Sequence, residues 1–165
     1  MEASGAFVDM LRTLERSGFG DGVRNVPYLY PVLESLHVLG IAVLVGPAVG
    51  VDLRLLGVGR NVLPVTKVTR YLLPLSHLGF ALAAVTGLTM FAGVAQSVGT
   101  SGAGALKLSL LVVAALNILL FHRGVYRGVA SWDVDVPAPR AARVAAWVSA
   151  LTWLGVIVAG RFLAY

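Results

Sequence analysis

Long apolar runs alternate with short polar connections along most of this chain. The runs cover about residues 28–56, 71–94, 106–121 and 141–165. Each is close to or above the roughly 20 residues that an α-helix needs to cross a bilayer core. The pattern predicts an all-α membrane protein, in which residues 27–165 form a four-transmembrane-helix bundle.

The segment 1–26 is too polar for a bilayer core, and it predicts a different element. Its apolar residues recur at helical spacing, at Phe7, Met10, Leu11 and Leu14. Charged residues fill the positions between them, which is typical of a helix with one apolar face. We expect a short amphipathic helix in the membrane interface, ended by Gly18 and Gly20.

Small residues mark the faces on which the predicted spans pack. In the second span the small residues Gly79, Ala83 and Gly87 follow one another at four-residue spacing. Gly46 and Gly50 form a GxxxG step in the first span. Both patterns allow another helix to approach closely.

The connections between spans differ in charge. Residues 57–70 form a basic connection, 96–105 an uncharged turn rich in Gly and Ser, and 123–140 a polar loop. The first and third connections carry most of the basic residues: Arg54, Arg60, Lys67, Arg70, Arg123, Arg127, Arg140 and Arg143. The positive-inside rule places them in the cytoplasm and both termini outside.

Composition excludes several classes of protein. Hydrophobic residues make up 58% of the chain and charged residues only 13%, against about a quarter charged in soluble domains. The net charge of +5 comes from the connections, so we expect the lipid bilayer and no nucleic acid as partner. With no cysteine, the chain has no disulfide, no cysteine-bound cluster and no covalently attached c-type haem.

Ionisable residues near the outer side of the spans form a candidate polar cluster. Its members are Glu34, His37, Lys107 and Arg161. Charges at membrane depth cost free energy without partners, so the cluster indicates either a functional site or residues that reach the interface. A Glu34–Arg161 ion pair would hold the first span against the fourth. Asn117 predicts a hydrogen bond between helices.

Three histidines are the candidate cofactor ligands. His77 lies about two turns inside the cytoplasmic boundary and His122 lies near it, so the two could face each other on adjacent helices. Two such imidazoles can clamp one haem b, which predicts a membrane protein of electron transfer. Three histidines are too few for two bis-histidine haems.

Other functions remain open at this level. Copper or another metal could bind His37, His77 and His122, although cysteine is absent and the chain has only three methionines. A cofactor-free subunit of a larger membrane complex, or a homo-oligomer, would use the small-residue faces. The sequence contains no hydrolase or transferase signature. If the protein is part of an enzyme, we expect it to be a membrane redox subunit.

Several motifs together resemble a known family. They are Glu34-x-x-His37-x-x-Gly40, the Asp52–Gly57 exit of the first span, Phe121-His122-Arg123, Trp132-Asp133, and the ending that begins at Gly160-Arg161. The chain resembles small, uncharacterised four-span bacterial inner-membrane proteins. These are distantly similar to cytochrome b561-like and copper-resistance-type membrane domains, which implies haem or copper.

The resemblance also bears on which histidine pairs with His122. It implies His37, and it places an aromatic residue where this chain has His77. However, His37 and His122 are expected to lie roughly 15–20 Å apart along the membrane normal.

Overall fold

The computed structural model describes residues 2–163, and side chains from Gly5 onward. Its helices are α1 (Glu2–Glu15), α2 (Gly18–Asn25), α3 (Leu29–Leu55), α4 (Val65–Gly93), α5 (Ala95–Gly99), α6 (Gly102–Arg123), the 3-10 helix η1 (Val125–Ser131) and α7 (Arg140–Phe162). The described part contains no strand. Helices α3, α4, α6 and α7 are long and apolar enough to cross a membrane, which confirms the predicted four-helix bundle and the short N-terminal helix.

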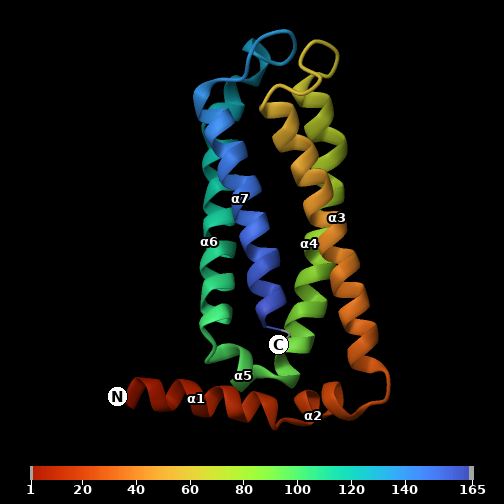
Figure 1. The fold of residues 1–165 in the computed structure, drawn as a ribbon, viewed down its shortest axis with the longest axis vertical. Coiled ribbons are helices and arrows are strands. Elements are labelled where there is room, and N and C mark those ends of the chain that lie inside the picture. The colour runs from red at the N-terminus through yellow and green to blue at the C-terminus, as the bar shows by residue number, and fades with distance from the viewer. Residues whose placement is uncertain (1, 164–165) are drawn as a thin grey trace.

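The bundle consists of two helix pairs (Figure 1). Helix α3 packs along α4, α6 packs along α7, and contacts between α3 and α7 join the pairs. The α3–α4 and α6–α7 connections lie at one end of the bundle, and α1, α2 and α5 lie at the other. We call these the loop end and the N-terminal end. Helices α4 and α6 make few or no direct contacts among the described residues, so the bundle is open between them.

Small residues bring α3 and α4 into backbone contact, as their spacing predicts. Gly79 lies directly against the α3 backbone at Leu44. One turn further along α4, Ala83 lies against Gly40 of α3. Of the GxxxG step only Gly50 meets the neighbouring helix, at Leu72, whereas Gly46 faces open space. The prediction of close approach is therefore correct for Gly50 and wrong for Gly46 within this chain.

We expect Gly79→Ala to destabilise the bundle, because its Cβ would collide with the backbone of α3. Overpacking of this kind costs about 1–3 kcal/mol. Gly46→Ala is the matched control, since a Cβ at Gly46 meets nothing. The stability of both variants is measured by unfolding in a denaturing detergent. Equal stability of the two would contradict the close α3–α4 contact.

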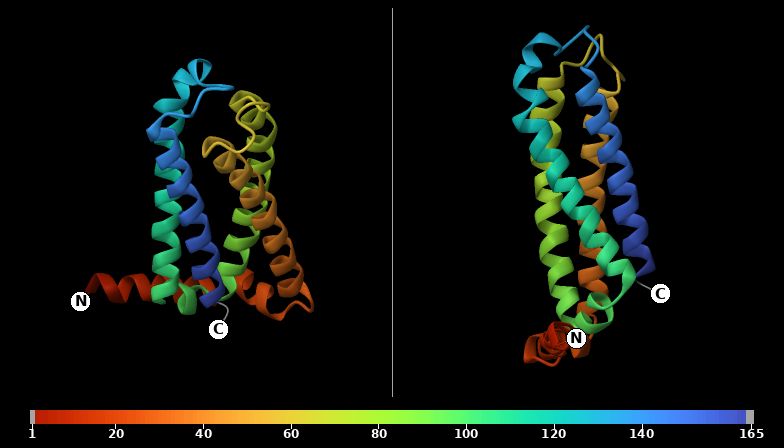
Figure 2. Two further views of the ribbon diagram at one scale, coloured as in Figure 1. Left: turned by 45° about the horizontal axis from the view of Figure 1, so that its top comes forward. Right: turned by 90° about the vertical axis from the view of Figure 1, so that its left-hand side faces the viewer.

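The N-terminal segment lies across the end of the bundle (Figures 1 and 2). Gly18 and Gly20 do not end its helical part, which corrects the sequence prediction. A second helix, α2, begins there because the Ser17 hydroxyl accepts a hydrogen bond from Gly20 N at 3.1 Å. Gly20 is buried against the carbonyl of Ala92, so its missing side chain permits the contact with α4.

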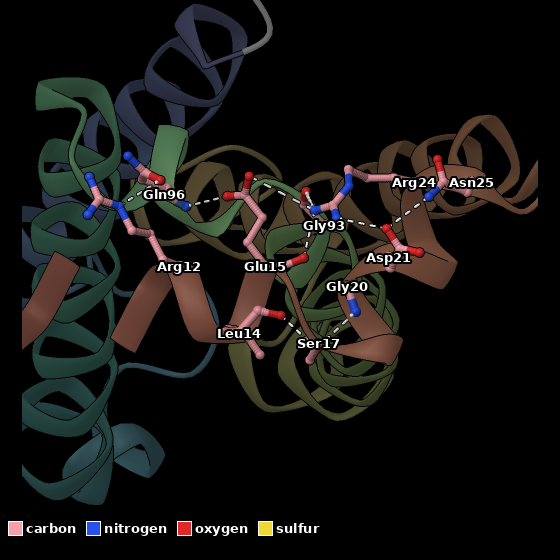
Figure 3. Close-up of polar contacts among 10 residues, drawn as sticks. All are labelled: Arg12, Leu14, Glu15, Ser17, Gly20, Asp21, Arg24, Asn25, Gly93 and Gln96. Atoms are coloured by element: carbon pink, nitrogen blue, oxygen red, sulfur yellow. Dashed lines mark hydrogen bonds and ion pairs between the residues drawn. The ribbon is translucent and has the colours of Figure 1, made fainter. Parts of the chain in front are cut away.

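Arg24 is the main link between this segment and α4 (Figure 3). Its guanidinium donates to the carbonyls of Glu15, at 2.7 Å, and Gly93, at 2.9 Å. The Glu15 carboxylate in turn accepts a hydrogen bond from Gln96 N at 2.7 Å. These bonds pair backbone groups where α4 ends and α5 begins.

Arg24→Ala is expected to loosen α1 and α2 without unfolding the spans. Loss of one charged hydrogen bond costs about 1.5 kcal/mol or more, which is roughly tenfold in local opening. Amide hydrogen exchange of residues 5–25 measures the change. Arg16→Ala, an exposed arginine of the same segment, is the control. Exchange that stays as slow as in the wild type would rule out this anchoring role.

The structure corrects the expected organisation of three stretches between the spans. Helix α4 begins at Val65 rather than near residue 71, because Asp133 of a distant loop accepts hydrogen bonds from the Thr66 amide and hydroxyl, both at 2.8 Å. The expected turn at 96–105 contains α5 and the start of α6, which Ser101 caps. The polar loop at 123–140 contains η1.

Candidate functional site

Two of the three histidines lie in one groove between α4 and α6. The groove has a volume of about 280 Å³ and is lined by Thr66, Thr69, Arg70, Leu73, Pro74, His77, His122 and Tyr126. His77 comes from α4 and His122 from the last turn of α6. Because α4 and α6 do not pack closely, their side chains line the groove from opposite sides.

The imidazole of His122 is oriented by its own helix. Its Nδ1–H donates to the carbonyl of Ile118 at 2.9 Å. A carbonyl only accepts hydrogen bonds, so this contact assigns the proton to Nδ1 and leaves the lone pair of Nε2 for a ligand. A backbone carbonyl commonly fixes the tautomer of a metal-bound histidine in this way.

Aromatic rings hold His122 from two sides. The ring of Phe121 meets it edge-on at 5.2 Å between centroids, and the ring of Tyr126 lies at 5.4 Å. The Tyr126 hydroxyl forms a 2.7 Å hydrogen bond with Thr69 of α4. Tyr126 therefore bridges η1 and α4 at the groove, which limits the freedom of the imidazole.

A larger hollow of about 540 Å³ lies along the α3–α4 connection, over residues 56–62. Arg60 is the only titratable side chain that lines it. It offers no imidazole or carboxylate, and so no donor for a metal or haem iron. The smaller groove is therefore the candidate site.

His37 lies elsewhere, between α3 and α4 in the half near the N-terminal end. Its Nδ1 lies 2.9 Å from the Ala83 carbonyl and 3.1 Å from the Thr86 hydroxyl. The ring lies against Gly87, so the small stripe of α4 makes room for it. His37 does not line the groove of His122, and the structure does not bring these two histidines together.

The remaining members of the predicted polar cluster are spread over three helices. Lys107 of α6 lies against Gly160 of α7, with its Nζ near the Gly160 Cα, and it interacts electrostatically with His37. Glu34 is exposed. The ion pairs of the described residues join Arg12 to Asp9 and Arg24 to Glu15 and Asp21. The predicted Glu34–Arg161 pair is not among these ion pairs. Arg161 does interact with another group.

Asn117 forms the predicted hydrogen bond between helices. Its Nδ2 donates to the Ala145 carbonyl of α7 at 2.9 Å. This bond ties α6 to α7 about one and a half turns below His122 and is structural.

Sequence reasoning took Asp52 and Arg54 as markers of the end of the first span, and it missed their burial. Asp52 is 6% exposed and Arg54 2% exposed. The Arg54 guanidinium donates to the carbonyl of Leu63 and, at 2.8 Å, to that of Asp133. Arg54 thus ties α3 to both connections at the loop end. The only signal in the sequence was that these two charged residues directly follow an apolar run, with no turn residue separating them from that run.

The donor set of the groove fits a haem better than a bare metal ion. Within residues 2–163 no group of three or more His, Cys, Asp or Glu side chains could hold a metal. A haem iron needs only two axial ligands from the protein, because the porphyrin supplies the other four. The groove volume lies just below the roughly 300–1,000 Å³ of enclosed ligand sites, so part of the porphyrin would face lipid.

Comparison with known proteins identifies a family but no activity. The model of a family of unknown function, DUF6644, matches residues 22–165. The chain therefore belongs to this family. Its own fold is that of a four-span membrane protein. No curated protein and no solved structure matches the chain, so the likeness to cytochrome b561 remains an analogy.

Proposed function

We propose that this protein binds one haem b in the groove between α4 and α6 and carries electrons within the membrane. His77 and His122 would hold the haem iron. Haem b supplies a one-electron Fe(III)/Fe(II) couple when bound. The observation that supports this most is that histidines from two helices line the same groove.

The surroundings of the groove support the same proposal. In the neutral imidazole of His122, the hydrogen bond to the Ile118 carbonyl places the lone pair on Nε2, which is then able to bind iron. Arg70 also lines the groove, and its guanidinium suits a carboxylate such as a haem propionate. Phe121 and Tyr126 contribute apolar ring surface on the His122 side.

Membrane orientation is part of the proposal. Eight of the basic side chains lie in or beside the two connections at the loop end: Arg54, Arg60, Lys67, Arg70, Arg123, Arg127, Arg140 and Arg143. The positive-inside rule places this end in the cytoplasm and both termini outside the inner membrane. The haem would then lie near the cytoplasmic side.

A haem assay of the purified protein tests the proposal. The chain is expressed in haem-replete cells, extracted in mild detergent and assayed for haem per chain as the pyridine complex. We expect one haem b per chain. Fully folded protein without haem would reject the proposal, and metal analysis would then separate copper binding from a cofactor-free membrane subunit.

A further inference from the structure

Asp52 is the one acidic side chain that the structure buries inside the spanning bundle. It lies in the last turn of α3, and its exposed fraction is 6%. The other carboxylates of the described spans and connections are half-buried or exposed: Glu34, Asp133 and Asp135. Neither the groove nor the contacts at the loop end use its carboxyl group.

The carboxyl group of Asp52 has few polar neighbours. The Ser149 side chain of α7 lies near it. Its second oxygen, Oδ2, is buried and has no hydrogen-bond partner. An ionised carboxylate accepts several hydrogen bonds and is costly to bury without them.

No cation of the described residues neutralises this carboxyl. Arg54, two residues further along α3, directs its guanidinium to the carbonyls of Leu63 and Asp133. Apart from α2 at the N-terminal end, the helices packed against α3 are α4 and α7. Their titratable side chains are all exposed: Lys67, Arg70, Tyr71, His77, Arg140, Arg143 and Arg161. A buried charge without a counter-ion usually becomes neutral by taking up a proton.

Asp52 lies close to the loop end of the bundle. It is three residues from the last residue of α3, about 5 Å along the helix axis. A proton would therefore travel a short path between the interior and the water at that end.

We propose that Asp52 is a proton-binding site inside the bundle, which holds its proton as a neutral carboxylic acid and exchanges it with water at the loop end. Ser149 orients the acid. The ligand is a proton, and the site is independent of any cofactor in the groove. Ionisable groups in a membrane interior are frequently parts of proton pathways.

Infrared spectroscopy of the purified protein in lipid tests this proposal. We expect a C=O band of a protonated carboxylic acid at about pH 5, where an ordinary aspartate is mostly ionised, and this band should shift in D₂O. The band should be absent in Asp52→Asn and retained in Asp135→Asn, a control acid in an exposed loop. Ser149→Ala should shift its frequency, because a polar neighbour of the acid is lost. Folded wild-type protein with no band that depends on Asp52 would overturn the proposal.

The pH dependence of unfolding gives a second, independent readout. A folded state that binds one more proton than the unfolded state loses stability as pH rises, by up to tenfold in the unfolding equilibrium per pH unit. Asp52→Asn removes this proton, so the variant should show a smaller fall between about pH 4 and 6. Equal pH profiles of the variant and the wild type would contradict proton binding at Asp52.

Discussion

His122→Ala is expected to remove haem from the purified protein while the bundle stays folded. The side chain is on the surface of the groove and half-buried, so its loss leaves no large cavity. Loss of a partner that merely orients a metal ligand already costs about 10–100-fold in affinity. Loss of an axial ligand should cost at least as much, and His77→Ala should act in the same direction.

The third histidine provides the matched control. His37 is bonded to Ala83 and Thr86, outside the groove. His37→Gln keeps a side-chain donor for these contacts and should leave the haem content unchanged. Haem that survives in His122→Ala, or that disappears in His37→Gln, would show that the groove is not the site.

Arg54→Met is expected to cause the largest loss of stability. Its guanidinium is 2% exposed and pairs with carbonyls from both connections at the loop end. The substitution removes the donors of at least two part-buried hydrogen bonds, and each hydrogen bond to a charged group contributes about 1.5–3 kcal/mol. We therefore expect a loss of 3 kcal/mol or more, measured by unfolding in a denaturing detergent.

Two further variants sharpen this test. Arg54→Lys should restore little, because one ammonium cannot reproduce the spread of donors of a guanidinium. Arg60→Ala is the control, since its own side chain is half-buried and the contact to Arg54 is made by its carbonyl. A near-normal stability of Arg54→Met would mean that the connections are held by other contacts.

The length and spacing of apolar and small residues were enough to predict the spans and the small-residue faces on which α3 and α4 pack. These depend on local properties, namely hydrophobic length and the size of residues at four-residue intervals. The start of α4 could not be predicted in this way, because Asp133 caps it from a loop far along the chain. The helix at Gly18 was missed because glycine usually ends helices, whereas Gly20 is needed here for a close contact.

Depth along the spans predicted part of the candidate site. His77 and His122 were expected to face each other, and they line one groove. In the predicted outer cluster His37 turns towards α4 and Lys107 lies against α7, and a site shared by its members stays a prediction. The burial of Asp52 depends on how α7 packs over the end of α3, which no local pattern contains.

The most direct test of haem binding is an absorption spectrum of the detergent-purified wild-type protein, recorded oxidised and then reduced with dithionite. We predict a Soret band that shifts on reduction, with resolved α and β bands of a six-coordinate b-type haem. A flat visible spectrum from folded protein made in haem-replete cells would contradict the proposed function.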